Sequence, residues 1–161
     1  MNNRNLQQAI DKLSISDIYV REMVSKCHDD FNPKYSDIED LTLQTKHVVT
    51  RSETMKSDEG DLVFRVFIDV GIKWINNTSD KIPDDEYLVL IEATFIAEYS
   101  ITGELEQVCL DEFALKNVSY HVWPYWRELF SSQCERMRLP RILLPTVQLA
   151  QNQHKSTPTT D

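Results

Sequence analysis

The clearest structural signal in the chain is the stretch Leu62-Val63-Phe64-Arg65-Val66-Phe67-Ile68-Asp69-Val70-Gly71-Ile72-Lys73-Trp74. Large apolar side chains occupy every second position from Leu62 to Trp74 without a break, and the intervening positions carry Arg65, Asp69 and Lys73 together with Phe67. An unbroken period of two over this length is typical of a strand and leaves no room for a helix. We therefore predict one long strand with one face in the core.

The same alternation predicts three more strands. One runs from about Tyr87 to Ile101, another from Leu41 to Val49 with its turn at 53–60, and the first from Ile18 to Cys27. In the first strand we expect one face to hold Ile18, Val20, Glu22 and Val24. A polar crossing at 28–40 separates the first two strands, and a loop of this length in a compact domain is usually functional or disordered.

The period changes after Gly103. A short helix is predicted where Leu105, Cys109 and Phe113 recur at helical spacing, and a longer one is predicted to begin near Trp123, with Pro124 in its first turn. This second helix lies in a cluster of five aromatic residues within eleven positions: Tyr120, Trp123, Tyr125, Trp126 and Phe130. The layout is α+β, with a helical layer on one face of a four-stranded antiparallel sheet. We assign 1–14 to a flexible N-terminal arm, 15–149 to the domain and 150–161 to a disordered polar tail.

Composition excludes several classes of protein. The chain has 26 acidic against 17 basic residues, a net charge of −9, whereas a phosphate-binding surface needs clustered Lys and Arg. No cysteine or histidine spacing predicts a metal site, and the three cysteines fit a reducing compartment. No apolar run is long enough to span a membrane, and the polar start lacks a secretory signal. We expect a cytosolic protein that binds no nucleic acid.

The sequence contains no motif typical of an enzyme. The three glycines build no phosphate-binding loop, so we predict no cofactor. Glu92 and Glu98 share a strand face but would lie roughly 20 Å apart, too far to act on one bond. His121 beside the aromatic cluster is more typical of a packed or capping histidine than of a base. We therefore expect that the protein is not an enzyme, although an α+β enzyme of unknown class stays open.

Several short motifs resemble the SecB family of export chaperones. Trp123-Pro124-Tyr125-Trp126-Arg127-Glu128 is similar to the family's aromatic-Pro-Tyr-x-Arg-Glu, and 139–147 is similar to its Phe-Pro-x-Leu-x-Leu-x-Pro-Val. Ile18-Tyr19 and Leu90-Ile91-Glu92 match parts of its first and fourth strands. The resemblance runs from about Ile15 to Leu149.

The resemblance implies a homotetramer built as a dimer of dimers, and an ATP-independent holdase for unfolded polypeptides, including preproteins for Sec-dependent export. Clients would bind in a groove between the crossing loop and the helical layer, and the alternative place for Trp126 and Phe130 is the core of the tetramer. The groove would be lined by Phe31, Tyr35, Trp123, Tyr125, Trp126 and Phe130.

The resemblance also implies a surface for the motor ATPase SecA, made here by Glu22, Leu90 and Glu92. The sequence departs from the family pattern in two ways that count against SecA as a partner: Lys26 stands where the family has an acid, and the family's closing helix after 147 is absent. Some SecB-like proteins instead serve one antitoxin of a toxin–antitoxin system. Both partners stay open at this point.

Overall fold

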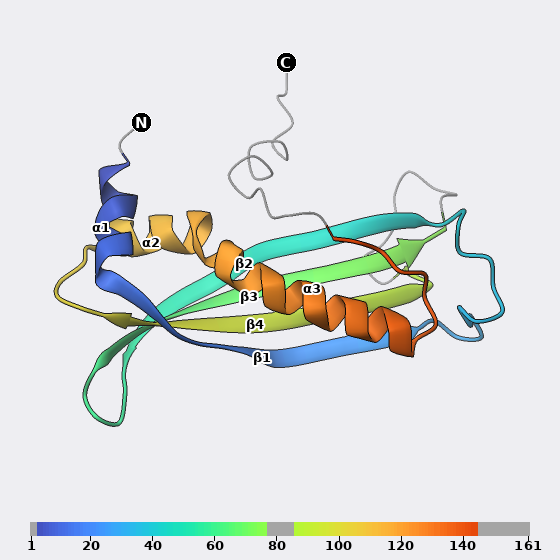
Figure 1. Ribbon diagram of the computed structural model, residues 1–161, viewed down its shortest axis with the longest axis horizontal. Helices are drawn as coiled ribbons and strands as arrows, with labels where there is room; N and C mark the ends of the chain where they lie inside the picture. Colours follow the sequence, from blue (N-terminus) through green and yellow to red (C-terminus); the bar gives the residue numbers. More distant parts are fainter. Residues whose placement is uncertain (1–2, 77–85, 145–161) are drawn as a thin grey trace, which may run out of the picture.

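The computed structural model describes residues 3–76 and 86–144 and shows a four-stranded antiparallel sheet with three helices on one of its faces (Figure 1). The elements, in chain order, are α1 Arg4–Lys12, β1 Leu13–Cys27, β2 Thr42–Lys56, β3 Leu62–Ile75, β4 Val89–Ile101, α2 Gln107–Lys116 and α3 Val118–Arg136. The predicted α+β class and the single helical layer are confirmed. The predicted polar tail at 150–161 lies outside the described residues.

The strands are ordered β1-β4-β3-β2, and all three pairings are antiparallel. β2, β3 and β4 form a meander, whereas β1 lies beside β4 at the far edge. The crossing loop, residues 28–41, makes this possible because it carries the chain from one edge of the sheet to the other. β1 and β2 are therefore the two edge strands.

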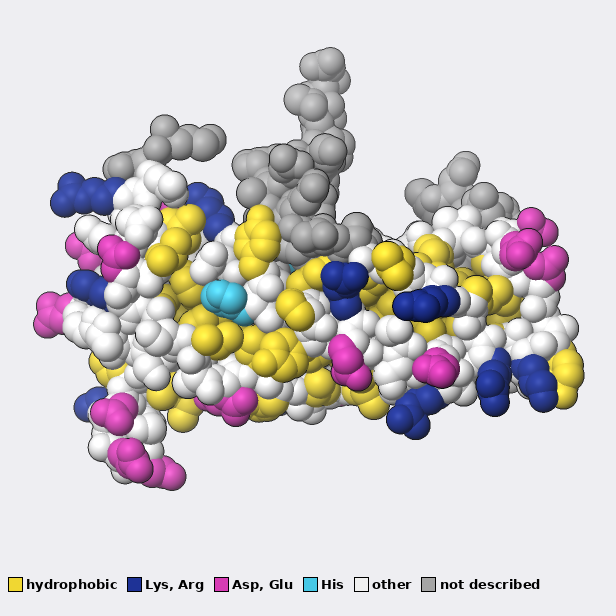
Figure 2. All heavy atoms as spheres, in the orientation of Figure 1, with side chains coloured by type: hydrophobic (Ala, Val, Ile, Leu, Met, Phe, Trp, Pro, Cys, Tyr) yellow, Lys and Arg dark blue, Asp and Glu magenta, His cyan; other side chains and the backbone are white. Residues whose placement is uncertain are grey.

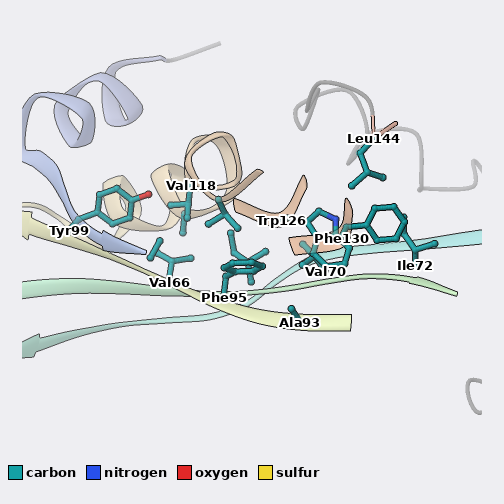
Figure 3. Packing of buried hydrophobic residues seen from close by; sticks show 14 of the residues in the cluster. Val66, Val70, Ile72, Ala93, Phe95, Tyr99, Val118, Trp126, Phe130 and Leu144 are labelled. Carbon is teal, nitrogen blue, oxygen red and sulfur yellow. The ribbon is translucent and has the colours of Figure 1, made fainter. Parts of the chain in front are cut away.

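The core lies between the sheet and α3, on the face predicted from the alternation in β3. Figure 3 shows Val66, Val70 and Ile72 of β3 and Phe95 of β4 pointing toward the helices. Two rings of α3, Trp126 and Phe130, fill the space above them, with their centroids 5.5 Å apart. Phe130 also stacks on Trp74 of β3, with 6.1 Å between the ring centroids. Helix and sheet thus share one aromatic layer.

The opposite face of the sheet carries no helix, yet its central ring, Phe67, is buried. Arginine side chains cover it: the guanidinium carbons of Arg51, Arg65 and Arg21 lie 3.7, 5.5 and 5.7 Å from the ring centroid. Because a guanidinium stacks on an aromatic ring and keeps its N–H groups in water, this face can bury apolar area without a second layer.

Two strand predictions were wrong in detail. A β-bulge between Val20 and Glu22 turns Val20 toward the helices and Glu22 toward the open face, so the two do not share a face as predicted. A bulge inserts one extra residue and reverses the alternation beyond it. In addition, residues 53–56, predicted as a turn, continue β2, because the turn is formed by 57–61.

The helical predictions also need correction. Residues 4–12, assigned to a flexible arm, form α1, whose Ala9 is completely buried. α3 begins at Val118 rather than near Trp123, so Pro124 lies inside it. Because proline has no N–H, Pro124 cannot donate to the carbonyl of Tyr120, four residues earlier. Both residues lie on the exposed side of α3, where water can hydrate that carbonyl.

α3 ends at a turn that sends the chain back along the helix. Arg138 adopts a positive φ of 59°, and the amides of Arg138 and Leu139 donate to the carbonyls of Glu135 and Cys134. These two bonds form a Schellman motif, in which the left-handed residue ends the helix. The segment 139–144 then passes along α3, and the buried Leu144 points toward Phe130 and Ile72 (Figure 3).

Candidate functional site

The six rings predicted to line a groove fall into three environments. Trp126 and Phe130 are 1% and 0% exposed, so the structure assigns both to the chain's own core rather than to a surface. Phe31 and Trp123 are half-buried. Tyr35 and Tyr125 are 79% and 52% exposed and are the rings that a partner can reach directly.

The crossing loop is anchored by apolar side chains and presents Tyr35 outward. Phe31, Ile38 and Leu41 pack against the core, and the amide of His28 donates to the carbonyl of Leu88 at 2.8 Å. The amide of Tyr35 donates to the carbonyl of Asn32 and closes a turn. The ammonium of Lys34 lies 5.2 Å from the centroid of the Tyr35 ring. The loop therefore holds an exposed ring on an anchored base.

No ring contact joins Phe31 or Tyr35 of the loop to Tyr125 of α3 within the described residues. The predicted groove is therefore not one continuous aromatic wall in this conformation. The exposed rings lie on two separate elements, the crossing loop and α3.

A trough that the sequence interpretation missed runs between α3 and the segment 139–144. It consists of two adjoining hollows of about 450 and 300 Å³, which share Ser131, Arg141 and Ile142. Leu143 and Leu144 add apolar lining, and Arg127 adds a second guanidinium. The signal was the leucine pair between Pro140 and Pro145, which we used for the family resemblance but did not assign to a surface.

The predicted partner residues Glu22, Leu90 and Glu92 lie on the open face of the sheet. Glu22 and Glu92 line a hollow of about 160 Å³ together with Asp69 and Lys46. Gly71 lies beneath it: a Cβ at this position would be 2.7 Å from Glu92 Cγ, so glycine lets the Glu92 side chain lie flat across β3. The sheet thus brings the two glutamates into one acidic hollow.

Leu90 lies next to this hollow and directly opposite Lys26 in the β1–β4 register. The ammonium of Lys26 is 5.5 Å from the Tyr87 ring centroid, and its hydrogen bond to Tyr87 raises the pKa of Lys26. A positive charge therefore stands beside Leu90, where the resemblance implies an acid.

Two histidines fasten the first turns of α3 to the sheet. His47 Nε2 of β2 lies 2.8 Å from Ser119 Oγ, and its ring stacks on Trp123 at 5.3 Å. His121 Nδ1 lies 2.7 Å from Tyr99 Oη of β4. Neither imidazole forms an ion pair with a carboxylate of the described residues, so neither has the third member that a catalytic triad needs.

These histidines make the stability of the protein depend on pH. Burial lowers the pKa of His47 and of His121 below the ordinary value of 6.5, whereas both rings regain that value on unfolding. Their contribution is therefore complete above pH 6.5 and is lost as the pH falls through the two lowered pKa values. Urea unfolding at pH 7.5 and at pH 5 measures this effect. Between these two pH values, the double variant His47→Gln/His121→Gln should lose less stability than the unmodified protein. An equal loss in the variant and the unmodified protein would contradict this assignment.

Residues 3–76 and 86–144 contain no group of three or more His, Cys, Asp or Glu side chains placed to hold a metal ion. None of their helices combines the length and hydropathy needed to cross a bilayer.

No protein-family model matches the sequence, and no curated protein matches it. Among solved structures, the chain is similar to a SecB-like chaperone of Mycobacterium tuberculosis, Rv1957, in complex with a ChAD peptide from the HigA1 antitoxin Rv1956. The TM-score is 0.68 at 17% identity, over 90% of this chain and 97% of that one. A protein of unknown function from Streptococcus agalactiae matches at a TM-score of 0.42 and 12% identity, over 83% of this chain and 97% of that one. The match to the Mycobacterium tuberculosis chaperone shows that the chain has a SecB-like fold.

Proposed function

We propose that this protein is a SecB-like chaperone that binds extended segments of unfolded or partner polypeptides without ATP and without catalysis. The SecB-like fold carries the proposal, since it extends over nine tenths of the chain. The rings that this fold leaves exposed, Tyr35 and Tyr125, add a surface of the kind such binding needs.

The physical case for client binding starts from the rings and the trough. Unfolded chains offer apolar side chains in no fixed order, and flat rings bind them by contact area rather than by sequence. Tyr125 and the trough beside Leu143 supply that area along α3, and Tyr35 supplies it on the crossing loop. β2 is an edge strand, so its outer edge offers backbone groups to an extended client.

We infer that the protein assembles with copies of itself into a tetramer. Figure 2 shows hydrophobic side chains gathered over the helical layer, the face that such an assembly would cover. Exposed apolar residues come from all three helices: Ile10, Val108, Leu115, Tyr120 and Tyr125. An apolar surface of this kind on a soluble chain is typical of an interaction site.

A second candidate is a chaperone dedicated to one antitoxin. It is favoured by one observation, namely that the Mycobacterium tuberculosis chaperone of similar fold was solved with an antitoxin peptide. The two candidates differ in their clients. A general chaperone should bind many unfolded chains, whereas a dedicated one should bind one partner tightly and ignore the others.

Delivery of preproteins to SecA is the third use of the same fold. The acidic hollow of Glu22 and Glu92 on the open face suits a basic partner, but Lys26 beside Leu90 opposes it. We expect Lys26→Glu to strengthen binding of SecA if this face is used. Unchanged binding would count against SecA as a partner.

The proposal is tested by native mass from light scattering, with and without a reduced, unfolded client. A mass near four subunits that rises by one client per oligomer would support a holdase. A compact monomer that ignores every unfolded chain and every candidate antitoxin would overturn the proposed function.

The crossing loop should contribute directly to client binding. The double variant Phe31→Ala/Tyr35→Ala removes the exposed ring and a half-buried ring of the same loop, and we expect about tenfold weaker binding, the loss typical of an interface hot spot. Fluorescence anisotropy of a labelled unfolded client measures this effect, and light scattering shows that the assembly stays intact.

Val48→Ala is the control, because Val48 is an exposed apolar residue on the open face of the sheet, away from both the crossing loop and the helices. If client binding is unchanged in the double variant, the crossing loop is not part of the site. An equal loss in the control would mean that exposed apolar side chains act without regard to position.

A further inference from the structure

We propose that the open face of the sheet binds a short acidic segment of a partner polypeptide through the guanidinium groups of Arg21 and Arg51. The two groups come from the opposite edge strands, β1 and β2, and both lie over the ring of Phe67 in β3. The helical layer is on the other side of the sheet. The site therefore goes beyond the proposed client binding and concerns a second kind of partner.

Two irregularities at the same level of the sheet place these side chains. The register of β1 against β4 shifts at Arg21, and that of β2 against β3 shifts at Thr50, whose hydroxyl donates to the carbonyl of Phe67 at 3.2 Å. Both shifts adjoin one row of paired residues across the four strands: Val20, Phe95, Ile68 and Val49. Bulges often re-aim a side chain next to a functional site.

The β1 bulge brings two adjacent residues of opposite charge onto the same face. Neighbouring residues of a regular strand point to opposite faces, but Arg21 lies over Phe67 while Glu22 lines the acidic hollow. The open face thus has a basic site directly beside an acidic one.

The arginines around Phe67 have more hydrogen-bonding capacity than the nearby carboxylates use. Arg65 takes both Glu53 and Glu98, and Arg51 shares Glu53 with it, with 3.2 Å between Arg51 Nη1 and Glu53 Oε2. Arg21 forms no ion pair within the described residues. Three guanidinium groups therefore face two carboxylates, and the N–H groups of Arg21 remain available to a carboxylate from outside.

The ring of Phe67 holds the two guanidinium groups in place before any partner binds. The guanidinium carbon of Arg51 is 3.7 Å from the ring centroid and that of Arg21 is 5.7 Å from it. The Arg51 side chain is still 51% exposed, so a partner can reach it. A guanidinium stacked on a ring loses little freedom on binding, and its planar edge matches the two oxygens of a carboxylate.

The neighbouring acidic hollow limits what the site can bind. Asp69, which lines the hollow with Glu22 and Glu92, is two residues along β3 from Phe67, a distance of roughly 7 Å. A long run of negative charge, such as the phosphates of a nucleic acid, would extend over these carboxylates and be repelled. A short acidic segment that continues with a basic residue fits both sites, so we assign the occupant to a polypeptide.

The test measures binding of two labelled synthetic peptides to the full chain at low salt by fluorescence anisotropy. One peptide carries two adjacent Glu residues followed by a Lys, and the other has Gln in place of both Glu residues. The unmodified protein should bind the Glu peptide more tightly. Arg21→Gln/Arg51→Gln should weaken the Glu peptide about tenfold and leave the Gln peptide unchanged, because only the former loses charged hydrogen bonds.

Arg4→Gln/Arg136→Gln is the matched control. It makes the same change in net charge at two exposed arginines of α1 and α3, away from the open face, and should leave both peptides unchanged. High salt should remove most of the difference between the Glu and Gln peptides, since the arginine pair is partly exposed. An equal loss in the control would mean that net charge alone attracts the peptide, and would overturn the site.

The remaining outcomes separate the site from the chaperone function. Equal binding of the two peptides by the unmodified protein, or binding of neither, overturns the site without any need for a folded variant. Displacement of the Glu peptide by a single-stranded oligonucleotide would overturn the assignment to a polypeptide, and a lower native mass of Arg21→Gln/Arg51→Gln would assign the arginines to contacts between copies and overturn it too. If the unmodified protein binds the Glu peptide but no unfolded client, the proposed function alone is overturned.

Discussion

Trp126→Ala is expected to lower the free energy of unfolding by about 3–5 kcal/mol, the usual cost of removing a fully buried large ring. The Trp126 side chain is 1% exposed and packs on Phe130, which in turn stacks on Trp74 of β3. Its loss leaves a cavity in the layer that joins α3 to the sheet. Urea unfolding followed by circular dichroism, at one fixed protein concentration, measures the effect.

The neighbouring Tyr125→Ala is the control for this experiment. Tyr125 is on the same helix but 52% exposed, so its replacement should change stability by no more than about 0.5 kcal/mol. Similar losses for the two variants would mean that Trp126 is not the core residue that the structure makes it. A loss that appears only as dissociation of an assembly would place Trp126 between subunits instead.

Arg65→Met should be the second most damaging change, with a loss of about 1–3 kcal/mol because several charged hydrogen bonds disappear together. Arg65 donates to Tyr19 Oη of β1 at 2.8 Å and to Glu53 Oε1 of β2 at 3.2 Å, and its Nε lies 3.4 Å from Glu98 Oε2 of β4. One guanidinium thus links all four strands across the open face. Methionine keeps part of the stem over Phe67 but leaves two carboxylates without this partner.

Arg21→Met is the matched control, since Arg21 also lies over the Phe67 ring but forms no ion pair within the described residues. It should cost no more than about 0.5 kcal/mol. The loss in Arg65→Met should shrink in high salt, because Arg65 is partly exposed and its ion pairs are screened. A salt-independent loss of equal size in both variants would mean that ring coverage, not the ionic network, stabilises this face.

The strands could be predicted because their signal is local. In β3 each apolar side chain is two positions from the next, and a pleated strand places such residues on one face. The bulge at Val20–Glu22 could not be predicted in this way. It depends on how β1 is paired with β4, and the sequence of β1 alone reads as an unbroken alternation.

The start of α3 was misplaced for a related reason. Proline usually marks the first turn of a helix, so Pro124 suggested a start near Trp123. The helix begins earlier because the buried Val118 and Val122 bind its first turns to the sheet, and this packing outweighs the hydrogen bond that proline lacks. Packing between distant segments decided the boundary.

The candidate site was only partly visible in the sequence. The aromatic cluster around Trp126 was visible in the sequence, but its rings could not be sorted into core and surface. Tyr125 and Trp126 are adjacent, and one is half exposed while the other is buried. Which one faces the sheet depends on the rotation of α3 about its axis, and this is set by packing against the sheet, where Phe130 of α3 stacks on Trp74 of β3.

The strands, the class of fold and the acidic net charge could be read from the sequence, because they follow from the spacing and charge of neighbouring residues. Three features emerge only from the folded chain: which rings remain exposed, how the segment 139–144 forms a trough with α3, and how α1 contacts residues almost a hundred positions away. Each of these depends on contacts between residues far apart in the chain. Such contacts leave no periodic trace in a single sequence.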